Sequence, residues 1–163
     1  MPVFNLACGT DYRSGMINVD RSLTAKADLR CDLCVIPWPI DSNTATGVLL
    51  SNFVEHIPPD VFPAFMRELH RIAKDGCRVE IVSPHWSSDN FHADPTHRLP
   101  VAARTFDFFD PTTALGVNGL LYGWGDIVFR VEKAVLGENP PNGPNVYHTL
   151  RAVKSDAAKR TED

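Results

Sequence analysis

A strand, an amphipathic helix and a second strand follow one another directly between residues 47 and 82, and this succession constrains the fold more than any other feature of the chain. Gly47 to Leu50 is apolar at consecutive positions, as in a central parallel strand covered on both faces. Apolar residues then recur at helical spacing from Val61 to Ala73, and the apolar run Val79 to Val82 follows. Because such a unit crosses over in a right-handed sense, its strands are predicted to be parallel and the fold class to be α/β.

The ends of this helix are also marked in the sequence. Pro58, Pro59 and Pro63 suit its beginning, because a proline in the first turn loses no helical hydrogen bond. Asp75-Gly76 is predicted to stop the helix, because glycine is common just after a helix end.

Further runs with the length and apolar content of strands lie on both sides of this unit. Three precede it, and two near the C-terminus predict an antiparallel hairpin. These runs are residues 3–7, 16–19, 27–30, 126–135 and 146–153. The chain is therefore predicted to form a doubly wound, mostly parallel Rossmann-like sheet with an antiparallel C-terminal hairpin.

The length of 163 residues is typical of a single domain, which we expect to span residues 1–153. Residues 154–163 are rich in charge and lack large apolar side chains, so we expect a flexible tail. Residues 84–118 are rich in Pro, His, Asp and aromatic side chains. We predict an irregular substrate loop region there, because long ordered loops in compact domains tend to carry function.

The composition predicts a soluble protein of the cytosol. Apolar residues make up 44% of the chain, and no apolar run approaches the about 20 residues that a membrane helix needs. Residues 1–5 lack the basic region of a secretory signal. A net charge of −4 without a stripe of Lys and Arg does not support binding to nucleic acid. The composition leaves the oligomeric state open.

The cysteines do not form a zinc-binding pattern. Cys31 and Cys34 have the spacing of a C-x2-C pair, but Cys8 and Cys77 are isolated and supply no second pair. We therefore predict no metal at these thiols, which are typical of small side chains in or near the core of a protein in a reducing compartment.

Candidate binding residues come directly after the predicted strands. In a doubly wound sheet, ligands bind beyond the carboxyl ends of the strands. The first strand is followed by Ala7-Cys8-Gly9, a turn in which glycine lets the backbone approach a ligand closely. The second ends at Asp20, which precedes Arg21 and can hold two ribose hydroxyls through its carboxylate oxygens.

The third and fourth strands are also followed by residues that could contact a nucleoside. Asp32 offers a polar acceptor beside the apolar Leu33, a pairing that suits an adenine amine and its ring face. Ser51-Asn52 follows the fourth strand. Taken singly, each of these residues is also common in turns and helix caps, so the prediction depends on their order. The candidate cofactor-binding residues are Ala7, Cys8, Gly9, Asp20, Arg21, Asp32, Leu33, Ser51 and Asn52.

The spacing of this site disfavours a nicotinamide dinucleotide. A dinucleotide fold places its ribose-binding acid about 20 residues beyond the glycines and its pyrophosphate on a helix N-terminus. Here Gly9 and Asp20 are only 11 residues apart, and residues 10–15 cannot house a helix of normal length. A cofactor that has no phosphate does not need a helix N-terminus for binding.

Five runs of the sequence together carry a family resemblance. They are Phe4 to Gly9, Gly15 to Asp20, Asp28 to Leu33, Asn52 to Ile57 and Arg67 to Gly76. With them, residues 4–84 resemble the small class I S-adenosylmethionine-dependent methyltransferases. The resemblance implies a Rossmann-like fold and S-adenosylmethionine as the cofactor.

The resemblance also implies a role for each candidate residue. Ala7 to Gly9 would face the methionine part of the cofactor and Asp20 the ribose. Asp32-Leu33 would hold the adenine, and Ser51-Asn52 would line the path to the methyl group.

The chain departs from the family at two positions. Ala7 stands where the family usually has glycine, and Asp11 occupies its third glycine position. The Ala7 methyl group lies where the backbone normally approaches the ligand, so a lowered affinity for the cofactor is predicted.

Candidate catalytic residues lie in the loop after the strand Val79 to Val82. His85, Asp94 and His97 are candidates for a base that takes a proton from the nucleophile, or for the group that orients it. The run from Asp94 to Arg98 also resembles that of some related small methyltransferases. Asp94 is equally compatible with an ordinary turn that leaves His97 solvated.

A metal site in the same loop is the other interpretation. His92, Asp94 and His97 are permitted metal ligands, but no carboxylate cluster flanks them, and we predict no metal.

These observations predict methyl transfer from S-adenosylmethionine to an O or N atom of an unidentified acceptor, which is the expected partner. One alternative is a non-catalytic module with this fold that binds a ligand or a partner, which Ala7 and Asp11 motivate. The other is a metal-dependent hydrolase that uses the histidines and aspartates of the loop.

Overall fold

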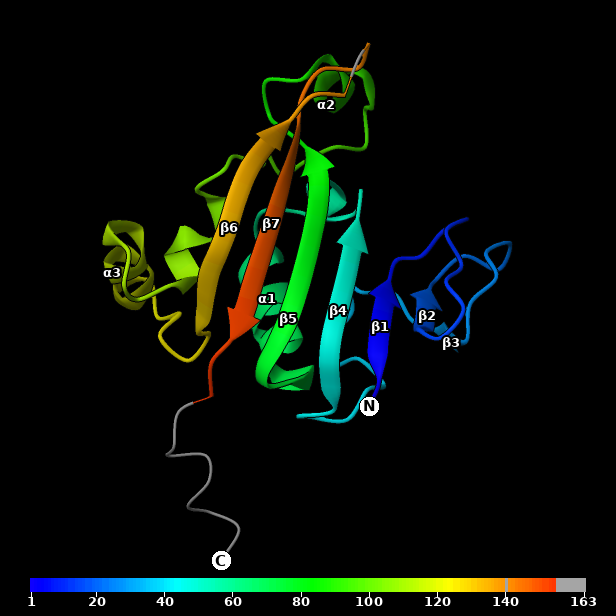
Figure 1. Ribbon diagram of the computed structural model, residues 1–163, viewed down its shortest axis with the longest axis horizontal. Helices are drawn as coiled ribbons and strands as arrows, with labels where there is room; N and C mark the ends of the chain where they lie inside the picture. Colours follow the sequence, from blue (N-terminus) through cyan, green and yellow to red (C-terminus); the bar gives the residue numbers. More distant parts are fainter. Residues whose placement is uncertain (140, 155–163) are drawn as a thin grey trace, which may run out of the picture.

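The protein contains one sheet of seven strands in the order β3-β2-β1-β4-β5-β7-β6 (Figure 1). Strands β1 to β5 are all parallel to one another, whereas β7 pairs antiparallel with both β5 and β6. The strands are β1 (Val3–Leu6), β2 (Ile17–Asp20), β3 (Leu29–Arg30), β4 (Ala45–Ser51), β5 (Ala73–Pro84), β6 (Phe129–Gly137) and β7 (Asn145–Ala152). The chain winds outward from β1 in both directions, so the predicted doubly wound sheet with a C-terminal hairpin is confirmed.

The computed structural model describes residues 1–139 and 141–154. The flexible tail predicted for residues 154–163 therefore lies, apart from Lys154, outside the described residues.

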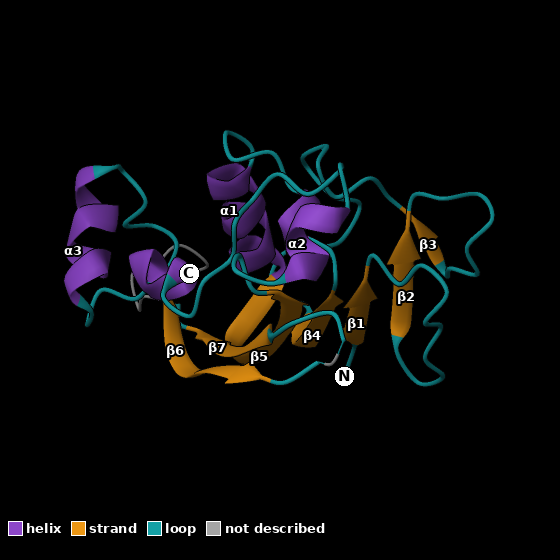
Figure 2. Ribbon diagram, turned by 90° about the horizontal axis from the view of Figure 1, so that it is seen from above, coloured by secondary structure: helices purple, strands orange, loops and turns teal. Residues whose placement is uncertain are grey.

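Helix α1 (Phe62–Ile72) forms where the helical spacing predicts it, with Pro63 in its first turn. Its buried face, which includes Phe65, Met66 and Leu69, belongs to the same hydrophobic core as the strands β4 and β5. In Figure 2, α1 and α2 (Asp89–Ala93) lie on the same face of the sheet. This face holds the core of the protein.

The prediction that Asp75-Gly76 ends this helix is wrong. The helix ends at Ile72, and Ala73 is already extended and pairs with Ala45 of β4. Because strand pairing begins at Ala73, no further helical turn can form. Gly76 has a φ of +76° and lies within β5 instead.

The sheet face opposite α1 is polar at β5 and β7. Arg78 and Glu80 of β5 alternate with the buried Val79 and Ile81, and they form an ion pair of 2.8 Å. Arg151 of β7 pairs with Glu132 in the same way.

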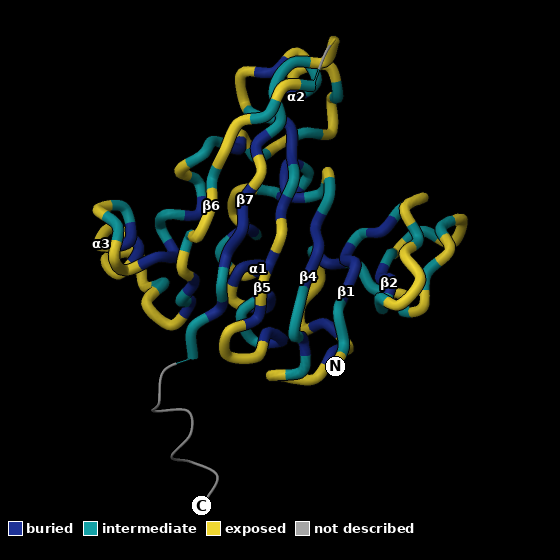
Figure 3. Tube along the Cα trace, viewed as in Figure 1, coloured by how far each residue is buried: buried dark blue, intermediate teal, exposed yellow. Residues whose placement is uncertain are grey.

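Figure 3 shows exposed residues concentrated in the peripheral loops and on α3 (Ala114–Leu121), whereas buried residues follow the central strands and α1.

Residues 84–118 contain short helices rather than the irregular loop that we expected. Besides α2, the 3-10 helix η2 (Thr105–Phe109) and most of α3 lie there. The Thr113 hydroxyl accepts a hydrogen bond from the Gly116 backbone N–H at 2.9 Å, and the Ser88 hydroxyl caps α2 in the same way. Such N-caps are the sequence feature that could have predicted these helices.

Within residues 1–139 and 141–154, no helix is long and apolar enough to cross a membrane.

A buried hydrogen-bond network takes the place of a helix between β1 and β2. The Asn18 side chain is fully buried, and its Oδ1 accepts from Asn5 Nδ2 (3.0 Å) and from the Arg13 backbone N–H (2.8 Å). Its Nδ2 donates to the backbone oxygens of Arg13 and Met16 and to Asp28. The hydrogen bonds from Asn18, first of all that from its backbone N–H, lower the pKa of Asp28. The Asn18 side chain therefore forms hydrogen bonds to both loops that flank β2.

We predict that Asn18→Ala lowers the free energy of unfolding by about 3 kcal/mol or more, because it leaves several buried polar groups without partners. Urea denaturation measures this change. The exposed Asn118→Ala on α3 serves as the control, with an expected change within about 0.5 kcal/mol. Equal midpoints for the two variants would contradict the structural role of Asn18.

Candidate functional site

A cavity of about 640 Å³ lies at the carboxyl ends of the parallel strands β1 to β4. The chain segments that follow these four strands form its walls, together with the loop after α2. This is the position at which open α/β sheets bind ligands. The lining residues are Ala7, Asp20, Arg21, Cys31, Asp32, Leu33, Cys34, Asn52, Phe53, His56, Pro58, Thr96 and Arg98.

Asp20, the last residue of β2, presents an oriented carboxylate to this cavity. Its Oδ2 accepts a hydrogen bond from the Gly9 backbone N–H at 2.8 Å, and its Oδ1 accepts one from the Ser22 backbone N–H at 2.7 Å. Both bonds are local to the turns after β1 and β2. Because each carboxylate oxygen can accept more than one hydrogen bond, both oxygens can still receive a ligand hydroxyl.

A second carboxylate, that of Asp32, lies on the wall formed after β3. Its Oδ1 accepts from the Cys34 backbone N–H (2.9 Å) and its Oδ2 from Arg21 Nη1 (3.0 Å). The hydrogen bond from Cys34 and the ion pair with Arg21 lower the pKa of Asp32 against the opposing effect of burial. This wall therefore carries an oriented ion pair between Asp32 and Arg21.

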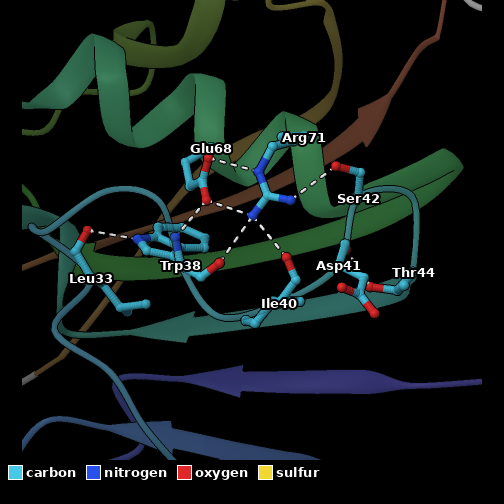
Figure 4. A network of polar contacts seen from close by, with 8 residues as sticks. All are labelled: Leu33, Trp38, Ile40, Asp41, Ser42, Thr44, Glu68 and Arg71. Atoms are coloured by element: carbon cyan, nitrogen blue, oxygen red, sulfur yellow. Dashed lines mark hydrogen bonds and ion pairs between the residues drawn. The ribbon is translucent and has the colours of Figure 1, made fainter.

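The wall beside Asp32 is anchored to α1 by a buried polar network (Figure 4). The Trp38 indole N–H donates to the Leu33 carbonyl at 3.1 Å, and the Trp38 backbone N–H donates to Glu68 at 2.7 Å. Arg71 forms an ion pair with Glu68 (2.6 Å) and donates to the Ile40 carbonyl (2.8 Å). The network holds Leu33 against the cavity, although no regular secondary structure connects β3 with β4.

Three residues around the cavity have backbones in the left-handed region. They are Ala7, Gly9 and Asn52, with φ angles of 54°, 51° and 51°. Of these, Ala7 and Asn52 line the cavity. The positive φ of Ala7 explains why glycine suits this position in the family that the chain resembles.

The structure gathers most, but not all, of the predicted cofactor-binding residues at the cavity. The lining includes Ala7, Asp20, Arg21, Asp32, Leu33 and Asn52. Gly9 contributes through its bond to Asp20, and Ser51 ends β4 without lining the cavity. Cys8 is buried, and its thiol lies 3.4 Å from the Lys26 carbonyl oxygen.

From the sequence, Glu55-His56 is compatible with a helix cap or with a place at the pocket, and the structure places His56 in the cavity wall. This residue lines the cavity and lies in the 3-10 helix η1 (Val54–His56), and its Nδ1 is 2.9 Å from the Thr96 hydroxyl. The neighbouring Glu55 is fully buried, and its carboxylate has no hydrogen-bond partner among the described residues. Burial raises the pKa of Glu55 to about 7. An acidic residue buried in this way is the type of group found at functional sites.

The predicted catalytic residues divide into two groups. His85 does not line the cavity, and its Nδ1 lies 2.7 Å from the Ser87 hydroxyl. Asp94 and His97 lie together behind the wall, with 3.7 Å between Oδ2 and Nε2. Asp94 forms the expected turn by accepting from the Thr96 backbone N–H at 2.8 Å. The alternative that His97 is solvated is wrong, since its side chain is 6% exposed.

The comparisons with known proteins give a match in structure alone. No family model and no curated protein matches the chain. An S-adenosylmethionine-dependent methyltransferase from Archaeoglobus fulgidus is similar in structure, with a TM-score of 0.59 and 19% identity over 92% of this chain and 85% of that protein. A second one, from Methanosarcina mazei, has a TM-score of 0.60 and 9% identity over 94% and 93%.

A third similar structure contains ligands. It is 1,6-didemethyltoxoflavin-N1-methyltransferase from Burkholderia thailandensis, with 1,6-didemethyltoxoflavin and S-adenosylhomocysteine bound. Its TM-score is 0.58, with 14% identity over 93% of this chain and 71% of that protein. The chain has the fold of the S-adenosylmethionine-dependent methyltransferases.

Within this methyltransferase fold, Ala7 is a strained position that can be tested. We predict that Ala7→Gly raises the free energy of unfolding by about 0.5 to 1 kcal/mol. Glycine removes the about 1 to 2 kcal/mol cost of a left-handed alanine, and its greater freedom in the unfolded chain offsets part of that gain. Thermal or urea denaturation measures the difference.

Ala93→Gly, at the exposed end of α2, is the matched control and should change stability in the opposite direction. A destabilised Ala7→Gly variant would contradict the left-handed conformation of Ala7.

Proposed function

We propose that this protein transfers a methyl group from S-adenosylmethionine to an O or N atom of an acceptor. The observation that carries this proposal is the Asp20 carboxylate, which Gly9 and Ser22 orient toward a cavity at the carboxyl edge of the sheet. The cavity volume is within the range of about 300 to 1,000 Å³ found for small-molecule sites. The methyltransferase fold supports the same function.

The residues of the cavity fit the chemical groups of S-adenosylmethionine. Asp20 would accept hydrogen bonds from the ribose hydroxyls, and Asp32 and Leu33 would hold the adenine amine and its ring. The turn Ala7 to Gly9 would face the methionine part.

The remaining wall of the cavity is available to the acceptor. It is formed by Asn52, Phe53, His56, Thr96 and Arg98. When S-adenosylmethionine is bound, it supplies a methyl group on a good leaving group. The acceptor atom forms a bond to this methyl group as the carbon–sulfur bond breaks, and any proton on the acceptor leaves to a base or to water. Much of the catalysis can therefore be positioning.

The candidate catalytic residues take different roles in this proposal. Asp94 accepts a hydrogen bond from the Thr96 hydroxyl at 2.7 Å, and Thr96 contacts His56. We therefore assign Asp94 and His97 to positioning His56 rather than to contact with the acceptor. His85 receives no role, because it lies outside the cavity.

We predict that Asp20→Ala weakens binding of S-adenosylhomocysteine by about 2 kcal/mol or more, the scale of lost charge-assisted hydrogen bonds. Isothermal titration calorimetry measures this loss. The control is Asp11→Ala, because Asp11 is an exposed carboxylate that pairs with Arg13 and does not line the cavity. An unchanged affinity in Asp20→Ala would remove Asp20 from the site, and binding lost equally in both variants would point to general electrostatics.

The same titration tests the non-catalytic alternative. A module that uses the fold to bind a different ligand would show no affinity for S-adenosylmethionine or S-adenosylhomocysteine. If both bind and no methyl group is transferred to any acceptor offered, the protein would be a nucleoside-binding module.

A further inference from the structure

Glu55, His56 and His97 are brought together by a backbone contact between distant segments. The Glu55 carbonyl accepts hydrogen bonds from the backbone N–H groups of Arg98 (2.7 Å) and Leu99 (2.9 Å). This contact fastens the loop after α2 to η1. As a result, a carboxylate oxygen of Glu55 and one ring nitrogen from each histidine lie within 4.8 Å of one another. The two imidazole rings are in contact, with centroids 4.6 Å apart.

The hydrogen bond of His97 determines which of its nitrogens is free. His97 Nδ1 lies 2.9 Å from the Phe91 carbonyl oxygen. Because a carbonyl can only accept, Nδ1 must carry the proton. The other nitrogen, Nε2, is then an acceptor with an available lone pair in the neutral ring.

The same argument applies to His56 through two further residues. Asp94 Oδ1 lies 2.7 Å from the Thr96 hydroxyl and takes its only proton. The Thr96 oxygen must then accept from His56 Nδ1, at 2.9 Å. His56 Nε2 is therefore also an acceptor with no proton of its own. In metal sites, a hydrogen bond on one imidazole nitrogen commonly orients the other toward the ion.

The side chain of Glu55 lies beside these two imidazole nitrogens. Glu55 is 0% exposed, and neither of its side-chain oxygens has a hydrogen-bond partner among the described residues. Buried polar atoms without partners are rare, because their desolvation is not compensated. A second carboxylate, that of Asp94, lies 3.7 Å from His97 Nε2 and adds negative charge. A cation would satisfy all of these acceptors together.

We propose that Glu55, His56 and His97 bind a divalent transition-metal ion. Two imidazole nitrogens and one carboxylate are ligands that suit Zn²⁺, Fe²⁺ or Co²⁺ and leave coordination positions open. With metal–ligand distances of about 2.0 to 2.2 Å, ligand atoms lie about 3 to 3.5 Å apart, so the side chains, whose ligand atoms lie within 4.8 Å, need to close by no more than about 2 Å. Because His56 lines the cavity, the ion is within reach of molecules that enter it.

This ligand set differs from the one considered in the sequence. His92 is exposed on α2 and does not join the cluster, and Glu55 and His56 come from a segment about 40 residues earlier. The proposal does not depend on methyl transfer. If the proposed function is correct, the ion lies at the acceptor end of the cavity and can hold an acceptor oxygen, which lowers the pKa of a bound hydroxyl.

In the test, the tag-free full chain is treated with chelator and then titrated with Co²⁺. Binding is monitored by the visible absorption of the bound Co²⁺ and by calorimetry. We expect about one Co²⁺ per chain and competition by Zn²⁺. Glu55→Gln and His97→Gln should each weaken Co²⁺ binding by about 100-fold or more, because each removes a ligand. Thr96→Val should weaken it by about 10-fold, because it removes the group that orients His56.

His92→Ala is the matched control and should bind Co²⁺ as the unchanged protein does. No Co²⁺ binding by the unchanged chain, or full binding by Glu55→Gln, would overturn the proposal, and loss of binding in His92→Ala would assign the ion to a different ligand set. If Glu55→Gln does not fold, His56→Ala provides the same test from the cavity wall. Titration of each variant with S-adenosylhomocysteine reports separately on the fold and on the proposed function.

Discussion

The buried amide of Asn18 is the interaction on which the cavity edge at β1 and β2 depends. It hydrogen-bonds to the loop between β1 and β2, to Asp28 before β3 and to Asn5 in β1. These bonds position the turns that present Gly9 and Asp20. A polar network of this kind requires every member to be satisfied, since the low dielectric of the interior penalises any unpaired group.

A second network does the same for the opposite wall. Glu68 is buried beside Trp38 and pairs with the partly exposed Arg71, so the segment after β3 is fixed to α1 without a helix of its own. Together the two networks explain how short loops produce a cavity with two oriented carboxylates. The cavity is therefore a consequence of polar contacts at the edge of the sheet, while the apolar core supports the strands from one face.

The cavity edge could be predicted from the sequence because the residues that line it follow directly after strands. Once the strand, helix, strand unit indicates a parallel sheet, the topology alone brings Ala7, Asp20 and Asp32 to one edge. The wall that contains His56 could not be predicted in this way. Glu55 and His97 meet only because the Glu55 carbonyl binds the backbone of Arg98 and Leu99, and no local pattern encodes this long-range contact. The helix end at Ile72 was missed for a similar reason, since pairing with β4 overrides the glycine at residue 76.

The central claim, that the cavity at the carboxyl edge binds S-adenosylmethionine through Asp20, is tested most directly by a crystal structure of the chain with S-adenosylhomocysteine. We expect the ribose hydroxyls to donate to both oxygens of Asp20, which keep their bonds to Gly9 and Ser22, and the adenine to lie beside Leu33. A nucleoside bound elsewhere, or one that leaves Asp20 without a contact, would contradict it.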